Sequence, residues 1–236
     1  MKRVSASVEW TYQATVARLL PSGDRLWPVR GGRVLLDVTA SHTQAMRVMR
    51  IYEPGRYRLL RRYLRPGDVF LDVGGHRGDF TVWAARRAGK VVCYEALPDN
   101  VRRIRQVIEA NDLDNAQVRH GAATAHGGRV HLNVSPKSGT NTLVTPTTFD
   151  PVGRIEVPAV RLDDQMDRAD VIKMDIEGAE VDALSGARRL LRGARLVVVD
   201  VHAFAGVDPD QVRSRLVDAG LYVTGTHRMV GRRIGP

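Results

Sequence analysis

A group of glycines behind a short apolar run has the residue types that point most directly to chemistry in this 236-residue chain. Residues 69–79 read VFLDVGGHRGD, so Asp72 stands just before Gly74, Gly75 and Gly78. A buried strand that leads into a glycine turn and then a helix is how α/β proteins hold cofactors that contain adenosine. We therefore assign Asp72 and the three glycines to a cofactor site.

Two carboxylates and the glycine spacing favour S-adenosylmethionine as that cofactor, with S-adenosylhomocysteine as its product. Asp72 would repel the pyrophosphate of a dinucleotide but attract the ammonium and sulfonium of S-adenosylmethionine. Glu95 follows the glycines by about 20 residues, where a carboxylate accepts hydrogen bonds from ribose hydroxyls. The spacing of Gly74 and Gly78 also departs from the G-x-G-x-x-G register of dinucleotide folds. An NAD-linked oxidoreductase and a glycine turn without a ligand are the weaker alternatives.

Small residues near the ends of two further strands are assigned to the same cofactor site. Ala96 directly follows Glu95, and Gly121 and Ala122 lie at the end of the third predicted strand. An adenine ring can pass close to a backbone where side chains are this small. A tight turn would use Gly121 and Ala122 equally well, so these two residues alone do not decide between the alternatives.

Three polar residues at or just after the ends of later strands are candidates for catalysis. Methyl transfer is a direct displacement in which an acceptor hydroxyl loses its proton, so it needs positioning and usually a base. Asp175 ends the fourth predicted strand and His202 the fifth, and carboxyl ends of parallel strands meet at one edge. Asp175 can orient the acceptor, take its proton or hold the cofactor; His202 suits a base at neutral pH, and Glu177 is the third candidate. The alternatives are a helix N-cap for Asp175 and a backbone-bonded strand end for His202, and we assign Glu180 to a cap-and-dipole role.

A divalent cation is the alternative use of these strand ends. Their spacing is not that of a tight ligand set, so we assign no metal ligand and keep magnesium as the alternative. The oxygen and imidazole groups in question belong to Asp175, Glu177, Asp200 and His202.

The elements that must position these residues alternate between strands and helices. Amphipathic spacing predicts the helices, and runs such as LVVVDVH, apolar almost throughout, are typical of central parallel strands. Repeated strand–helix units imply an α/β fold with a mostly parallel sheet covered by helices on both faces. The predicted strands are 33–39, 69–73, 90–96, 116–123, 171–175 and 196–202, the helices 79–88, 98–110, 178–192 and 209–219, and a strand or hairpin closes the chain from 221 to about 234.

An arginine-rich segment precedes the glycine turn. The chain has a net charge of +10, and residues 1–65 supply +9 of it, with 13 Lys/Arg against 4 Asp/Glu. A helix is predicted at 56–64, with Tyr57, Leu60 and Leu64 on one face and the arginines on the other. The charge is either a solvated surface or a patch for an anionic partner such as RNA.

We divide the chain into a basic extension, residues 1–50, and a cofactor-binding domain, residues 51–236. The extension is a candidate substrate-binding segment. Within the domain, residues 126–163 contain short alternating runs and a Ser/Gly/Thr-rich loop, which predict an inserted β-hairpin-like element. Long insertions in α/β domains often serve as lids or substrate walls. A plain extension of the main sheet is the alternative.

Nothing in the sequence points to a membrane or to an oxidising compartment. The one cysteine, Cys93, rules out an internal disulfide. No segment approaches the roughly 20 apolar residues of a membrane span, and the first residues lack a signal-peptide pattern. We expect a cytoplasmic protein with no membrane span.

Two blocks of the chain resemble the FkbM family of S-adenosylmethionine-dependent methyltransferases. They are VFLDVGGHRGDFT at 69–81 and VIKMDIEGAEVDALSGARRLL at 171–191, the second followed by LVVVDVH at 196–202. The pattern K-x-D-x-E-G-x-E in the second block is the more specific, and the likeness extends over roughly 50–205. The resemblance implies a seven-stranded Rossmann-like sheet and methyl transfer, usually to a hydroxyl oxygen of a sugar, lipid or secondary metabolite.

The first glycine turn departs from that family, which usually reads Gly-Ala-Asn/His where this chain has Gly75-His76-Arg77. The departure would place Arg77 near the pocket mouth. We expect a small-molecule O-methyltransferase. The nearest alternative is an RNA methyltransferase that docks through the basic N-terminal region, which requires the arginines of 47–65 on the side of the strand carboxyl ends.

Overall fold

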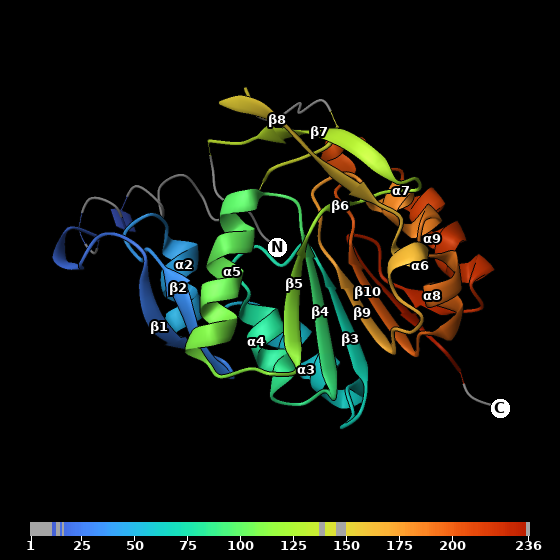
Figure 1. Ribbon diagram of the computed structural model, residues 1–236, viewed down its shortest axis with the longest axis horizontal. Helices are drawn as coiled ribbons and strands as arrows, with labels where there is room; N and C mark the ends of the chain where they lie inside the picture. Colours follow the sequence, from blue (N-terminus) through green and yellow to red (C-terminus); the bar gives the residue numbers. More distant parts are fainter. Residues whose placement is uncertain (1–10, 13–14, 16, 137–139, 145–149, 235–236) are drawn as a thin grey trace.

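One sheet forms the centre of the protein, and its seven described strands lie in the order β11-β12-β10-β9-β3-β4-β5 (Figure 1). β5, β4, β3, β9 and β10 are parallel, whereas β12 is antiparallel to both of its neighbours. The predicted mostly parallel α/β sheet and its closing hairpin are thereby confirmed. The strands are β3 (Val69–Val73), β4 (Lys90–Glu95), β5 (Ala116–His120), β9 (Val171–Met174), β10 (Leu196–Asp200), β11 (Tyr222–Thr224) and β12 (Arg228–Arg232). The computed structural model describes residues 11–12, 15, 17–136, 140–144 and 150–234.

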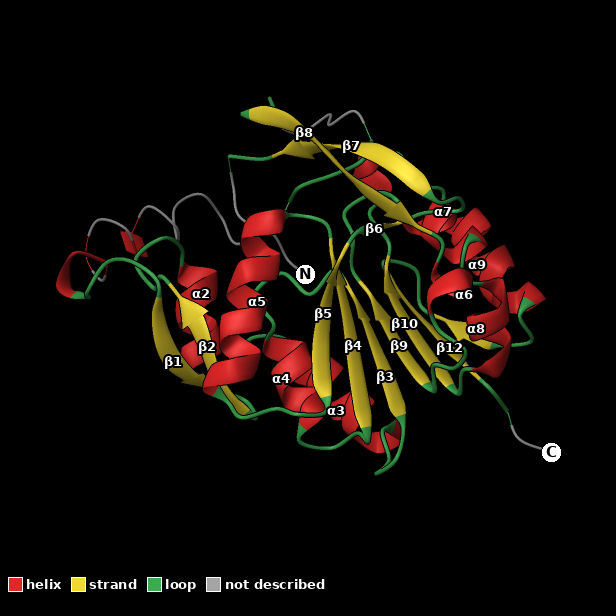
Figure 2. Ribbon diagram, in the orientation of Figure 1, coloured by secondary structure: helices red, strands yellow, loops and turns green. Residues whose placement is uncertain are grey.

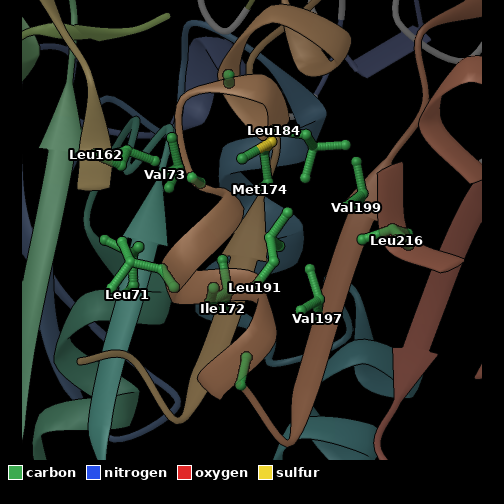
Figure 3. Close-up of a cluster of buried hydrophobic side chains, with 14 of the residues drawn as sticks. Leu71, Val73, Leu162, Ile172, Met174, Leu184, Leu191, Val197, Val199 and Leu216 are labelled. Carbon is green, nitrogen blue, oxygen red and sulfur yellow. The ribbon is translucent and has the colours of Figure 1, made fainter. Parts of the chain in front are cut away.

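The central strands are apolar because both faces of the sheet are covered. All residues of β9 and the first four of β10 are buried. Figure 3 shows Leu71, Ile172 and Val197, from three adjacent strands, in one cluster with Leu184 and Leu191 of the covering helices. This packing fixes the strands, and with them the carboxyl edge where the predicted site residues lie.

Helices cover both faces, as predicted (Figure 2). One face packs against α3, α4 and α5 through Tyr57, Phe80 and Val107. The other packs against α6, α7, α8 and α9 through residues such as Leu162 and Leu216. The helices are α2 (His42–Val48), α3 (Pro54–Tyr63), α4 (Asp79–Ala85), α5 (Pro98–Ala110), α6 (Leu162–Gln165), α7 (Glu180–Ser185), α8 (Arg188–Gly193) and α9 (Pro209–Asp218), with short 3-10 turns η2 (Ala17–Leu19) and η3 (Ala203–Ala205).

A two-stranded hairpin precedes the main sheet. β1 (Arg25–Val29) and β2 (Gly32–Leu36) pair antiparallel, and Val34 and Leu36 are fully buried in the core that α4 and α5 share. β2 is thus shorter than the strand predicted at 33–39.

Helix α3 crosses the sheet from its carboxyl edge to its amino edge. Arg56, near the start of α3, contacts Asp175 just after β9, whereas the carbonyl of Tyr63, its last residue, accepts a hydrogen bond from Arg195 just before β10. The prediction that the arginines of this helix occupy its outer face is wrong for Arg56, which is buried in ion pairs. Acidic groups at the strand ends provide partners there for a buried guanidinium.

A second sheet lies over the carboxyl edge of the first (Figure 1). β7 (Gly128–Val134) and β8 (Gly153–Val160) are antiparallel, and β6 (Ala122–Ala123) pairs with β8. The alternating runs of the predicted insertion therefore form a hairpin, and the alternative of an extended main sheet is wrong. The single strand predicted at 116–123 is wrong as well, because the chain leaves the main sheet after His120 and joins the second sheet at Ala122.

The helix predicted at 178–192 is divided into α7 and α8 at Gly186. A Cβ at Gly186 would lie 2.0 Å from the carbonyl oxygen of Thr124, so the helix is interrupted where another backbone crosses it closely. Elsewhere, α5 matches the predicted span 98–110. No helix in the described part of the chain combines the length and the apolar character needed to cross a membrane.

Candidate active site

A pocket of about 590 Å³, open space at its mouth included, lies where β3, β4, β5 and β9 end. The strand ends bring together seven residues predicted from the sequence, and they line this pocket: Gly74, Glu95, Ala96, Gly121, Ala122, Asp175 and Glu177. Sequence reasoning missed Leu132, Asn141 and Leu143, which the insertion contributes to the wall. The insertion therefore covers part of the pocket. Four predicted site residues are not among the described residues that line the pocket: Asp72, Gly75, Gly78 and His202.

The glycine turn is built by close backbone contacts. Gly74 has φ +83°, and a Cβ there would lie 1.9 Å from the carbonyl oxygen of Asp175, so only glycine allows β3 and β9 to end side by side. Gly75 lies over the buried thiol of Cys93, where a Cβ would come within 2.2 Å of Sγ. Gly78, with φ +82°, precedes α4 and packs on Ile104. Gly75 and Gly78 thus shape the turn from outside the pocket.

Asp72 has a different place from the one predicted. It is fully buried, forms an ion pair with Nζ of Lys173 at 3.0 Å and accepts a hydrogen bond from the Thr81 hydroxyl at 2.7 Å. Lys173 also donates to the carbonyl of Gly74 at 2.7 Å. Because Lys173 neutralises Asp72, its carboxylate cannot select a cationic cofactor as argued from the sequence. The pair instead anchors the glycine turn.

Glu95 ends β4 and faces the pocket. Its two carboxylate oxygens accept hydrogen bonds from the backbone N–H groups of His76, at 2.8 Å, and Leu97, at 2.9 Å. Burial raises its pKa, while these hydrogen bonds oppose the shift. Each carboxylate oxygen has a second lone pair, so Glu95 can also accept from ribose hydroxyls, as predicted.

His76 and Arg77, the departures from the family pattern, have separate environments. His76 lines the pocket with φ 51°, and burial together with the nearby Arg47 lowers its pKa to about 3, so its ring is neutral. Arg77 is buried and lies 3.4 Å from Asp24 of the N-terminal segment. The expectation that Arg77 faces the pocket mouth is wrong, because Asp24 pairs with it on the outer side of the turn.

The three residues predicted to be catalytic come together. Nε2 of His202 lies 3.6 Å from Asp175 and 3.4 Å from Glu177, and ligand atoms of all three lie within 4.8 Å of one another. Glu177 has φ 56°, a conformation that is costly for a residue with a side chain and is found mainly at functional sites. The loop after β9 thus holds its carboxylate toward His202.

Glu180, which the sequence interpretation assigned to a cap-and-dipole role, contacts the predicted catalytic residue His202. Its side chain is fully buried and accepts a hydrogen bond from Nδ1 of His202 at 2.5 Å, besides one from the backbone N–H of Gly178 at 3.2 Å. A cap-and-dipole role alone is therefore incomplete. No local pattern signals this contact, because Glu177 lies in the loop before α7 while Glu180 is the first residue of that helix.

The charges of this cluster follow from its contacts. Burial would lower the pKa of His202, but hydrogen bonds to Glu177 and Glu180 outweigh it and raise the pKa to about 10. Burial raises the pKa of Glu177, and the hydrogen bond and charge of His202 partly oppose this rise. Burial would also raise the pKa of Asp175, yet Arg56 and Lys173 hold it below its usual range. At neutral pH the cluster is an imidazolium among carboxylates.

Comparison with known proteins agrees with this geometry. Residues 72–222 match the family model described as the methyltransferase FkbM domain. The hexuronic acid methyltransferase AglP of Haloferax volcanii is 27% identical over 187 residues, which are 75% of this chain and 75% of that protein.

Two solved structures share the fold. Methyltransferase FkbM from Methylobacillus flagellatus KT has a TM-score of 0.53 at 16% identity, and Trm5b from Pyrococcus abyssi has 0.51 at 11%. The matches cover 80% and 90% of this chain but only 52% and 56% of those proteins. This chain thus spans about half the length of each.

Proposed function

The chain belongs to the FkbM family of methyltransferases, and on that premise we propose that it methylates a hydroxyl of a sugar-like small molecule. The predicted S-adenosylmethionine-dependent methyltransferase is thereby confirmed as a class. The observation that carries the proposal is the cluster of Asp175, Glu177 and His202, in which Asp175 and Glu177 line the glycine-turn pocket. When bound, S-adenosylmethionine supplies an electrophilic methyl group on a positively charged sulfur.

The pocket fits such a cofactor. Carboxylates of Glu95, Asp175 and Glu177 line it, and their negative charge complements an ammonium and a sulfonium. Small residues, Gly74, Ala96, Gly121 and Ala122, line the pocket at the strand ends. Asp72, Gly75 and Gly78 support the turn without lining the pocket. We assign the direct cofactor contacts to Gly74, Glu95, Ala96, Gly121 and Ala122.

We propose that Glu177 accepts the proton that the acceptor hydroxyl loses during methyl transfer. Hydrogen bonds to Glu177 and Glu180 raise the pKa of His202 to about 10, which favours the imidazolium at neutral pH, so we do not assign the base to His202. The Glu177 carboxylate lines the pocket and lies 3.4 Å from Nε2 of His202. Glu180 fixes the imidazolium through Nδ1, so that Nε2 can stabilise Glu177 and the oxygen that reacts.

The acceptor is proposed to lie between the insertion and the turn after β10. Leu132 and Leu143 give the pocket an apolar wall, and Phe204 stands half-exposed at 5.4 Å from the His202 ring, between ring centroids. An aromatic ring beside the His202 imidazole suits the C–H face of a sugar ring. The name of the relative AglP also supports a sugar acid as the acceptor class.

A hydroxyl suits this site better than the carboxylate of a sugar acid. A carboxylate acceptor brings its own negative charge and needs no base, whereas the pocket wall already carries Asp175 and Glu177. A hydroxyl must lose a proton during transfer, and Glu177 can take it. We therefore propose ether formation.

The division of the chain at residue 50 remains our proposal. Asp24 of the extension contacts Arg77 at 3.4 Å and Arg103 at 2.7 Å. Since Arg77 follows His76 of the pocket wall, the extension lies against the glycine turn. This supports a role for residues 1–50 beside the pocket, with residues 51–236 as the methyltransferase domain.

The experiment is methyl transfer to methyl β-D-glucuronoside, with calorimetric titration of S-adenosylhomocysteine in parallel. We expect binding of the product and an alkali-stable methyl ether. An alkali-labile ester would contradict the hydroxyl assignment, and absence of binding at millimolar S-adenosylhomocysteine would contradict the pocket.

A further inference from the structure

Arg56 is a buried cation at the edge of the active site that neither the motifs nor the cofactor assignment uses. Its side chain is only 2% exposed. Nη1 donates to Oδ2 of Asp175 at 3.0 Å, Nε lies 3.1 Å from Glu53, and Nη2 contacts Asp200. Each nitrogen of the guanidinium therefore faces a different carboxylate.

The surrounding contacts hold this guanidinium in one orientation. α3 begins at Pro54, after Glu53 in the left-handed conformation with φ 49°. Arg228 on β12 contacts Glu53 at 2.8 Å and Asp200 at 2.6 Å, so the two arginines and the two acids form a closed ring. A planar guanidinium in such a ring has little freedom to turn.

Arg56 lies between two strand ends that each present a carboxylate. Asp175 follows β9 and Asp200 ends β10, and both largely buried carboxylates contact the same guanidinium. Arg56 supplies that charge from within the chain, and its fork geometry matches two carboxylates at once.

We propose that Arg56 is the resident cation of the methyl-transfer centre, a positioning residue that keeps Asp175 ionised and oriented along the pocket wall. Asp175 then orients the acceptor or cofactor as a fixed hydrogen-bond acceptor, and the proton goes to Glu177. The inference rests on the proposed function.

The charges around Asp175 support this division of roles. Arg56 reaches it from α3, Lys173 from β9 and His202 from just after β10, while Glu177 in the following loop is a like charge and Glu180 pairs with His202. Burial alone would raise the pKa of Asp175. The pKa is lowered nevertheless, and Arg56 is the largest of the influences that lower it.

The test is a double-mutant cycle of Arg56→Met and Asp175→Asn, with methyl β-D-glucuronoside as the acceptor probe. Arg58→Met is the matched control, because Arg58 lies two residues along the same helix and is exposed. We expect Arg56→Met to lower kcat on the order of 100-fold. We expect the KM for S-adenosylmethionine to stay near the wild-type value, and the control to stay within about two-fold of wild-type kcat.

The double variant should lose no more than Asp175→Asn alone, since Arg56 acts through Asp175. Additive losses, or wild-type kcat in folded Arg56→Met, would overturn the proposal. If Arg56→Met does not fold, Arg56→Lys decides: it keeps one charge but spans fewer carboxylates. Its acidic pH limb should move to higher pH, and a wild-type profile would refute the assignment.

A second measurement separates this proposal from the proposed function. ¹³C NMR of the aspartate carboxyls, with Asp175 assigned from Asp175→Asn, needs no acceptor. If the wild type fails to methylate the probe, the acceptor assignment fails. The role of Arg56 is still upheld if Asp175 titrates at higher pH in the Arg56 variant, and refuted if it titrates as in the wild type.

Discussion

The chemistry at the scale of single residues depends on one imidazole held by carboxylates. His202 contacts Glu180 through Nδ1 and faces Glu177 and Asp175 through Nε2. Because both nitrogens meet anions, the pKa of the ring is raised, and for that reason we propose Glu177 rather than His202 as the base. The position of His202 near a strand end therefore does not indicate its protonation state. That state depends on Glu180 and Glu177, which lie 22 and 25 positions away in the sequence.

Replacing Glu177 with Gln tests the base directly. The amide keeps the size of the side chain but cannot take a proton, so we expect kcat to fall on the order of 100-fold. Affinity for S-adenosylhomocysteine, measured by calorimetry, should change little. Asp182→Asn is the control, since Asp182 is exposed on the neighbouring helix. Near wild-type turnover in Glu177→Gln would remove Glu177 from the mechanism.

The pH dependence of stability should reflect His202. Its pKa is raised from 6.5 to about 10 in the folded protein, so its stabilisation is complete below pH 6.5 and is lost as pH rises through about 10. Chemical denaturation of the wild type and His202→Gln should therefore show a difference in unfolding free energy that shrinks across this window. A difference independent of pH would contradict the raised pKa.

Helices and strands could be predicted where one pattern of apolar residues extends through the whole element. They could not be predicted where the backbone of a distant segment interrupts the element. α5 and the five parallel strands follow from local patterns of apolar residues. The break at Gly186 and the change of sheets at Gly121 depend on Thr124 and Val160, which approach those glycines from other elements. Arg56 was misplaced for a similar reason, because its burial depends on acids that follow β9 and end β10.

The insertion should contribute to cofactor binding through one face of β7. Leu132 is buried and lines the pocket, whereas His131, the preceding residue, is exposed on the other face. We expect Leu132→Ala to raise the Kd of S-adenosylhomocysteine about ten-fold, equivalent to about 1.4 kcal/mol. His131→Ala should leave the Kd unchanged in the same titration. Equal Kd values for both variants would show that β7 does not contact the ligand.

Charge over the whole molecule separates small-molecule from RNA acceptors. The excess of positive charge lies before the glycine turn, but Arg47 and Arg56 are buried in ion pairs. Arg61 and Arg62 are exposed in the last turn of α3, which ends at the amino edge, opposite the pocket. The structure therefore gives no support to RNA docking through these arginines.

Reversing two of these charges tests the point. Arg61→Glu combined with Arg62→Glu should leave methyl transfer to the glucuronoside within about two-fold of wild type, because neither side chain is near the pocket. Docking of an anionic polymer would instead require these charges, and activity would fall steeply with salt. Loss of turnover in the charge-reversed variant would instead support RNA as the methyl acceptor.

The thiol beneath Gly75 gives the protein a built-in reporter. Cys93 is the single cysteine of the chain and is fully buried, and its burial, together with Asp72, raises its pKa well above the usual value. A thiol-reactive dye can therefore react only when the packing on β4, to which the glycine turn and α5 contribute, opens. The labelling rate then reports how often this opening occurs. A ligand that holds the turn closed will slow the labelling, and no assay of turnover is needed to detect it.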